Sequence, residues 1–144
     1  NKNKLKYSKL LKLNFINIEK VDKPNIIINT TSNYDILKKS LKLLCLDGKF
    51  IEASWYGNKR TKISLGGYFH SKRLKIISSQ VSNIPKFMEN KYNYKTRLDL
   101  AIRALADDKL IKLINHESEF SNINKEYISI LNDPNTLMHA IKYL

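Results

Sequence analysis

The chain has 144 residues, enough for one domain with a core of its own. Its net charge is +13, but the basic residues are spread along the whole chain and no block of like charge marks a nucleic-acid-binding tail. No run approaches the roughly 18 apolar residues that a membrane span needs. The single cysteine, Cys45, excludes an internal disulfide framework and a Cys-based zinc site. We therefore expect neither a specific nucleic-acid partner nor a membrane, and attribute the charge to a Lys-, Asn- and Ile-rich codon bias.

The first half of the sequence alternates between helix and strand patterns. Leucines among lysines over Lys2–Leu13 predict a short amphipathic helix. The apolar run NIIINTTS (25–32) predicts a strand buried on both faces. Asn33 can cap the next helix, which ends at Asp47-Gly48 before the strand KFIEASWY (49–56). That helix carries an apolar stripe, in which Cys45 is expected to be buried, formed by Ile36, Leu37, Leu41, Leu44 and Cys45.

The second half begins with two segments that look extended. TKISLGGYFHS (61–71) looks extended, with a turn or bulge at its glycine pair and an exposed edge over Lys62–Tyr68, and RLKIISSQ (73–80) also looks extended. An irregular polar loop follows over 82–95. The clearest helix pattern spans 96–110, with Thr96 as its cap and Leu98, Ala101, Ile102 and Leu105 along one face. A last helix is expected near Asn124–Asn132, and MHAIKYL (138–144) reads as a final strand or tail.

Strands and helices in this order and spacing predict an α/β fold with a parallel sheet and crossover helices. The three strand patterns also end alike, passing from bulky apolar residues to small, hydroxyl-bearing ones: NTTSN, ASWYG and SSQVS. Ligands of open α/β sheets bind beyond the carboxyl ends of the strands, where small residues let the backbone approach a flat ligand. These endings therefore predict a ligand edge, although such residues are also common wherever a strand becomes a turn.

The ordered set NTTSN, DGKFIEASWYG, LGGYFHSKRLKIISSQV and INHESEF resembles the zinc-type medium-chain alcohol dehydrogenase superfamily, in its zinc-binding dehydrogenase branch. The resemblance covers nearly the whole chain. It implies a partial Rossmann-type, doubly wound parallel sheet, the second half of a nicotinamide-dinucleotide-binding domain, over residues 1–95. Residues 96–144 would form carboxy-terminal helices and a tail that pack on the parent's catalytic domain.

The resemblance also implies which residues border the cofactor, NAD or NADP. Lys4 falls near the adenosine ribose, and the three strand ends fall around the nicotinamide ring and its carboxamide. The implied cofactor-binding residues are Lys4, Thr30, Thr31, Ser32, Ala53, Ser54, Trp55, Ser78 and Ser79. The two aromatic residues Trp55 and Tyr56 could equally line the mouth of the site or pack in a core.

The function implied by the resemblance is hydride transfer between an alcohol or carbonyl substrate and a nicotinamide cofactor. Zinc would be bound outside this segment, since His70, His116 and His139 are widely spaced and lack cysteine partners. No catalytic residue is expected in the chain, which alone would be inactive. Two alternatives stay open: a basic nucleic-acid-binding α/β domain and an inactive structural remnant.

The resemblance further implies a cytoplasmic protein and a homodimer. The partner contact would run through the residues around Lys62–Tyr68, where an open strand edge invites a second chain to add to it.

Overall fold

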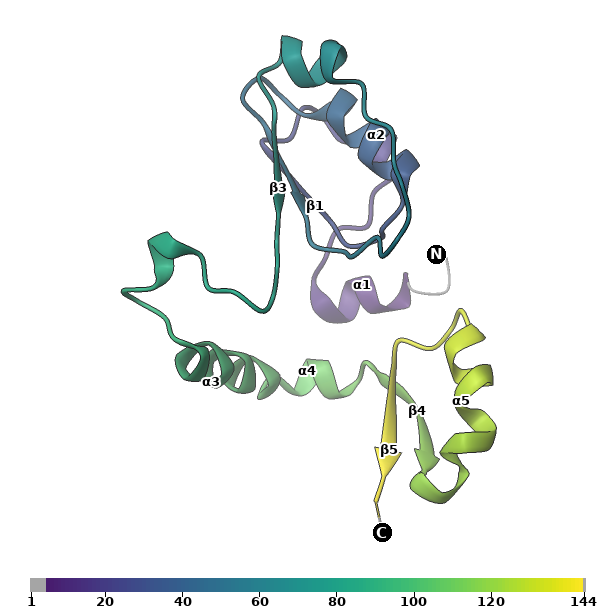
Figure 1. Ribbon diagram of the computed structural model, residues 1–144. Helices are drawn as coiled ribbons and strands as arrows, with labels where there is room; N and C mark the ends of the chain where they lie inside the picture. Colours follow the sequence, from purple (N-terminus) through teal and green to yellow (C-terminus); the bar gives the residue numbers. More distant parts are fainter. Residues whose placement is uncertain (1–4, 144) are drawn as a thin grey trace. The chain divides into compact units, whose positions relative to one another are not determined.

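The computed structural model describes residues 5–143, which form two compact units (Figure 1). The first unit spans Ile16–Ile84. The second contains the residues from Pro85 onward together with the described residues up to Phe15. The two units therefore divide between 84 and 85, ahead of the expected boundary at 95. Lys4, one of the expected cofactor residues, lies outside the described residues.

The first unit is built on a three-stranded parallel sheet in the order β1-β2-β3. Strand β1 (Ile26–Asn29) pairs with β2 (Lys49–Glu52), and β2 pairs with β3 (Lys75–Ser78). Helix α2 (Tyr34–Leu43) connects β1 to β2 (Figure 1). The expected α/β class, the parallel sheet and the crossover helix are thus confirmed, and each strand is shorter than its sequence pattern suggested.

The core of this unit lies between α2 and one face of the sheet. Phe50 on β2 is fully buried, and the helix covers it with its predicted apolar stripe. The buried core residues are Leu37, Leu41, Leu44, Phe50 and Leu74. Cys45 was expected to join them, but it is only half-buried, and its thiol lies 3.0 Å from Asn25 Oδ1 because the helix has already ended at Leu43.

The opposite face of the sheet is open in the described part of the chain. Ile26 is 51% exposed and Ile28 63% exposed, and Ile77 on β3 is 41% exposed. The expectation that β1 is buried on both faces is therefore wrong for these residues, since α2 covers only the face that carries Ile27 and Phe50.

The turn from α2 into β2 depends on Gly48. A Cβ atom at this position would lie 3.0 Å from the carbonyl oxygen of Cys45 and 3.0 Å from Leu44 Cβ, so a larger residue requires these neighbours to move by a few tenths of an ångström. Lys72 closes the same turn from the other side, because its Nζ donates to the carbonyl oxygens of Lys42 at 2.8 Å and Leu44 at 2.7 Å. These carbonyls are the unpaired acceptors at the end of a helix.

The segment before β3 differs from the prediction. Leu65–Phe69 forms a helical turn that is broken at Gly67, and residues 61–64 form no regular element. The expected extended edge over Lys62–Tyr68 is therefore wrong. Phe69 and Ile63 instead pack against the core under α2, whereas Leu65 and Tyr68 remain exposed.

The second unit contains a parallel pair of strands, β4 (Ile114–Glu119) and β5 (Met138–Lys142), connected by α5 (Ile123–Asn132). The last helix and the final strand are confirmed, but the strand pattern of β4 was not predicted. Its polar sequence, INHESE, lacks the apolar alternation that marks a strand.

The remaining helices of the second unit are α1 (Lys6–Leu11), α3 (Tyr94–Leu105) and α4 (Asp108–Ile111). Asn93, and not Thr96, caps α3, and Thr96 completes a capping box with it at 2.9 Å in each direction. The expected single helix over 96–110 is interrupted after Leu105, where Asp107 caps α4. Leu98, Ile102 and Leu105 are more than half exposed.

Candidate functional site

The three strands of the first unit end at one edge of the sheet. Asn29, the last residue of β1, pairs in register with Glu52 of β2, and Glu52 pairs with Ser78 of β3. The backbone continues this ladder past the strands, since Ala53 N–H donates to Asn29 O at 2.9 Å and Ser79 N–H donates to Glu52 O at 2.8 Å. The structure therefore brings together the strand ends from which the sequence predicted a ligand edge.

The loops after β1 and β2 are joined by a network of polar side chains. Asn29 is 2% exposed, and its amide donates to Glu52 Oε2 at 2.9 Å. The other carboxylate oxygen of Glu52 accepts from the amide of Ser54 at 3.0 Å and from the Ser54 hydroxyl. Ser54 Oγ in turn accepts from Ser32 N–H at 2.7 Å. The carboxylate thus connects the two loops through Asn29 on one side and Ser54 on the other.

The β1 side of this network includes two predicted residues with tightly held backbones. Thr31 donates to Asn29 Oδ1 with its amide at 3.2 Å and with its hydroxyl at 2.8 Å. Ser32 has φ 45, in the left-handed region that residues other than glycine rarely adopt. Its bond to Ser54 Oγ holds this conformation, which immediately precedes the N-cap Asn33 of α2.

Glu52 and Tyr56 are the titratable groups of the network. Burial raises the pKa of the Glu52 carboxyl, but hydrogen bonds from Ser54 and Asn29 outweigh burial and hold the pKa below its ordinary value. Burial, together with the neighbouring Glu52 carboxylate, raises the pKa of Tyr56 above its ordinary value. At neutral pH Glu52 is therefore an acceptor only, and Tyr56 keeps its proton.

The other predicted residues lie at the same edge and are more exposed to solvent. Thr30, Ala53, Ser78 and Ser79 are exposed, and Trp55 is 89% exposed. Of the two alternatives for Trp55, packing in a core is therefore wrong. Such an exposed indole beside the edge is free to contact a ligand.

Three residues organise the edge but were not in the predicted set of cofactor-binding residues: Asn29, Glu52 and Tyr56. Asn29 and Glu52 were read as parts of strands. A signal for both was present, because a polar residue at the buried end of an apolar run usually has a specific partner.

Two hollows lie beside these elements. The smaller, about 360 Å³, opens at the predicted edge and combines Tyr56 and the residues after β1 with two cations. Its lining consists of Thr31, Ser32, Asn33, Tyr34, Tyr56, Lys59, Arg60 and Thr61. The basic residues Lys59 and Arg60 make this end of the edge suitable for an anionic group.

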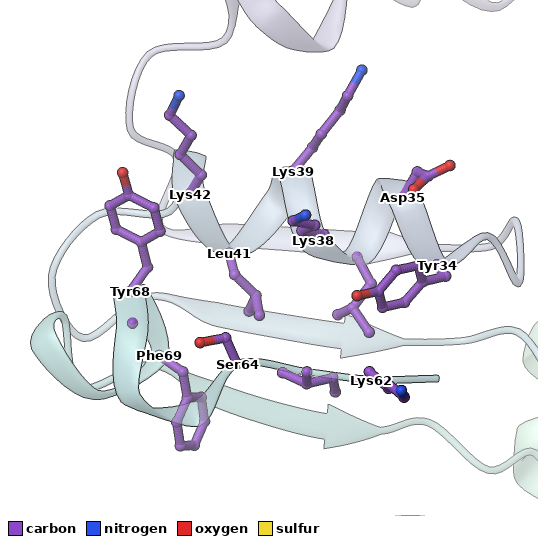
Figure 2. Close-up of a pocket in the computed structure, with 13 residues that line it drawn as sticks. Tyr34, Asp35, Lys38, Lys39, Leu41, Lys42, Lys62, Ser64, Tyr68 and Phe69 are labelled. Atoms are coloured by element: carbon purple, nitrogen blue, oxygen red, sulfur yellow. The ribbon is translucent and has the colours of Figure 1, made fainter. Parts of the chain in front are cut away.

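The larger hollow, about 850 Å³, is a groove between α2 and the segment 62–69. Figure 2 shows it running along the helix from Tyr68 to Tyr34, with Leu41 pointing down from α2 into it. Its apolar floor is largely the core itself, since Leu37 and Leu41 are 4% and 6% exposed. Lysines along α2 border it.

The described residues contain no group of three or more His, Cys, Asp or Glu side chains that could hold a metal ion. His116 and His139 stack with ring centroids 6.4 Å apart, but His116 faces Asp133 at 3.6 Å and His139 contacts Ser118 Oγ at 2.9 Å. No helix in the described chain is long and apolar enough to cross a membrane.

No known protein-family profile and no curated protein sequence matches the chain. Solved structures do match it. The 2R,3R-butanediol dehydrogenase of Bacillus subtilis has 8% identity and a TM-score of 0.72, over 100% of this chain and 42% of that one. An alcohol dehydrogenase of E. coli CFT073, complexed with NADH, has 20% identity and a TM-score of 0.68, over 94% of this chain and 40% of its own.

The glucose dehydrogenase of Haloferax mediterranei, in complex with NADP, Zn and gluconolactone, has 12% identity and a TM-score of 0.66. The match covers 99% of this chain and 40% of that one. The chain thus spans about two fifths of the length of these solved structures. At such identities the likeness concerns the fold, and it confirms the Rossmann-type fold that the sequence implied. This chain has the fold of a segment of the alcohol and sugar dehydrogenases.

Proposed function

We propose that this chain supplies the nicotinamide side of a dinucleotide site in an oxidoreductase that moves a hydride between an alcohol and a carbonyl compound. The observation that carries the proposal is the in-register ending of three parallel strands at Asn29, Glu52 and Ser78, followed by small hydroxyl-bearing loops. Edges of this kind are where open α/β sheets bind ligands. The similar folds of dehydrogenases complexed with NADH and NADP support it.

The bound nicotinamide would accept or donate the hydride. The residues of this chain would bind and orient it. The exposed loop residues Thr30, Ala53 and Ser79 leave room for a flat ring to approach, and the exposed Trp55 indole is free to contact it. Lys59 and Arg60, at the mouth of the smaller hollow, would attract the anionic parts of the dinucleotide.

Zinc sites need three or four converging donors, and the described residues contain no such group. That zinc is bound outside this segment, in a longer protein, stays a prediction. The choice between NAD and NADP, the inactivity of this segment alone and a cytoplasmic location also stay predictions.

The proposal is tested by titrating the full-length expressed protein with NADH and recording energy transfer from tryptophan to the bound nucleotide. We expect saturable binding with energy transfer from Trp55, the one tryptophan of this sequence, and weaker NADH binding in Trp55→Phe measured by the fluorescence of the nucleotide itself. Binding by the wild type without energy transfer, or unchanged affinity in Trp55→Phe, would contradict the placement of the ring near this edge. Absence of NADH and NADPH binding would contradict the function itself.

A homodimer through the residues around Lys62–Tyr68 also remains a proposal. The expected strand edge would have paired through its backbone. The helical turn found there instead exposes apolar side chains that a second chain could cover, since Leu65 is 58% and Tyr68 48% exposed. Sedimentation of the wild type and Leu65→Asp at equal concentrations tests it. A dimer that persists unchanged in the variant would exclude this surface as the interface.

A further inference from the structure

Glu52 occupies a position where an acidic side chain is costly unless it is fully paired. It ends β2, the central strand of the sheet, beside the buried Asn29. A half-buried carboxylate needs hydrogen-bond donors to replace water. Here its two oxygens accept from Asn29 Nδ2, from Ser54 N–H and from the Ser54 hydroxyl. Three donors of the chain are thus aligned on this one carboxylate.

These bonds act on the loops and not on the strands. The β1–β2 ladder is already complete through Ala53 N–H and Asn29 O. What Glu52 adds is the direction of the Ser54 hydroxyl, because that hydroxyl donates its proton to Glu52 and presents its lone pairs to Ser32 N–H. On its other oxygen Glu52 orients the Asn29 amide, so that Asn29 Oδ1 faces the amide and hydroxyl of Thr31.

The resulting loop has a backbone conformation that is intrinsically unfavourable. Ser32 is held at φ 45, and such strain persists only where surrounding contacts fix it. The contact that fixes Ser32 comes from Ser54, and Ser54 is fixed by Glu52. The same loop starts α2 and lines the smaller hollow.

We propose that Glu52 is a positioning residue, which fixes the loops after β1 and β2 in the arrangement that receives the nicotinamide ring. This proposal rests on the proposed function. Glu52 itself touches neither ring nor substrate. It acts through Asn29 and Ser54, and the only other titratable group facing it among the described residues is Tyr56.

The pairing of Asn29 with Glu52 allows a test by exchange of donor and acceptor. In Glu52→Gln, the new NH2 group faces either Asn29 or Ser54, depending on how the amide is turned. Both of these partners need an acceptor, so at least one hydrogen bond is lost. Asn29→Asp places a second carboxylate beside Glu52. In the double variant, the new amide at position 52 donates to the new carboxylate at position 29, while the amide oxygen still accepts from Ser54 and the carboxylate still accepts from Thr31. The two changes together therefore restore the network with its polarity reversed.

The experiment compares the wild type, both single variants, the double variant and a control, Glu19→Gln, whose carboxylate is exposed and pairs only loosely with Lys39 at 3.6 Å. Amide hydrogen exchange is measured at Ser32 and Ser54, with Ala53 and Ser79 as ladder references. NADH affinity is measured on the same samples. Loss of one such bond weakens binding by about tenfold.

We expect each single variant to exchange faster at Ser32 and Ser54 and to bind NADH more weakly, with both properties restored in the double variant and unchanged in the control. Single variants with wild-type affinity, or a double variant no better than the sum of the two singles, would overturn the positioning role. If the wild type fails to bind NADH, the proposed function falls. Exchange at Ser32 and Ser54 then still decides whether Glu52 organises the loops, and unrescued exchange in the double variant would overturn that as well.

Discussion

Ser32 and Ser54, which follow different strands, are joined by a single hydrogen bond of 2.7 Å from the Ser32 amide to the Ser54 hydroxyl. The bond connects the start of α2 to the loop after β2, across the edge at which we place the ligand. Because Ser32 has φ 45, its loop has a strained conformation that this contact helps to maintain, together with the bonds from Thr31 to Asn29.

Ser54→Ala removes the acceptor of this bond and leaves the Ser32 amide without it. We expect weaker NADH binding with a loss of stability of about 1–3 kcal/mol, since the variant loses two hydrogen bonds, the one from Ser32 N–H and the one to Glu52. Ser40→Ala is a suitable control, because its hydroxyl is buried in α2 without a partner in the described structure. Titration with NADH and thermal unfolding of both variants test this. Equal NADH affinity in Ser54→Ala and the wild type would contradict a role for the bond in ligand binding.

Ser79→Phe should weaken nicotinamide binding, because the backbone after β3 must come close to the ring and Ser79 is exposed at that edge. The matched control is Ser71→Phe, an exposed serine that precedes β3 and so lies toward the opposite edge of the sheet. Both variants gain the same phenylalanine side chain, and they differ only in the end of β3 near which it lies. If the two bind NADH equally well, the carboxyl edge is not the ligand edge.

Gly48→Ala should destabilise the first unit. The added Cβ would meet the Cys45 carbonyl oxygen and Leu44 at 3.0 Å, and Leu44 has no exposed surface through which it could move away. We expect a loss of about 1–3 kcal/mol, the usual effect of overpacking a core. Chemical denaturation measures it, with Gly66→Ala, which meets no atom within 4 Å, as the control. A wild-type midpoint in Gly48→Ala would show that the turn can relax.

The depressed pKa of Glu52 predicts how stability depends on pH. A carboxyl whose pKa is lower in the folded than in the unfolded state stabilises the fold above its unfolded pKa. That stabilisation is lost as the pH falls through the folded pKa. We therefore expect the acid loss of stability to be shallower in Glu52→Gln, measured by urea unfolding at a series of pH values from neutral to acidic. The same slope in both proteins would show that Glu52 titrates alike in the folded and unfolded chain.

Any binding to DNA should be weak and should fall steeply with salt, since it would come from scattered lysines that release counterions. Fluorescence anisotropy with duplexes of unrelated sequence at low and high salt tests this. Sequence-selective binding that persists at high salt would instead favour the nucleic-acid-binding alternative.

The sequence predicted those parts of the fold that follow from apolar periodicity. The stripe on α2 and the β-branched runs of β1 and β3 identified the crossover unit, because the stripe packs on Phe50 and β-branched runs favour strands. The prediction for Leu65–Phe69 was wrong because so short an apolar segment has the same pattern in a strand and in a helical turn. Packing of Phe69 against the core determines which of the two forms. Strand β4 was missed because its residues are polar.

The position of the candidate site could be predicted from the sequence, but the side chains that hold it together could not. Small residues after three strands indicated the edge. Which side chains hold that edge depends on register, and the pairing of Asn29 with Glu52 exists only because β1 and β2 align these two positions. Residues 23 positions apart in sequence give no such signal by themselves.

The bond between Asn29 and Glu52 also restricts how this protein can evolve. A mutation that removes Glu52 leaves the buried Asn29 amide without its acceptor, and one that removes Asn29 leaves one carboxylate oxygen of Glu52 without its donor. The paired exchange to Asp and Gln keeps both groups satisfied. Descendants of this sequence should therefore change the two positions together or keep them both. Because this restriction comes from the cost of unpaired buried groups, it should persist even in lineages that no longer bind a ligand.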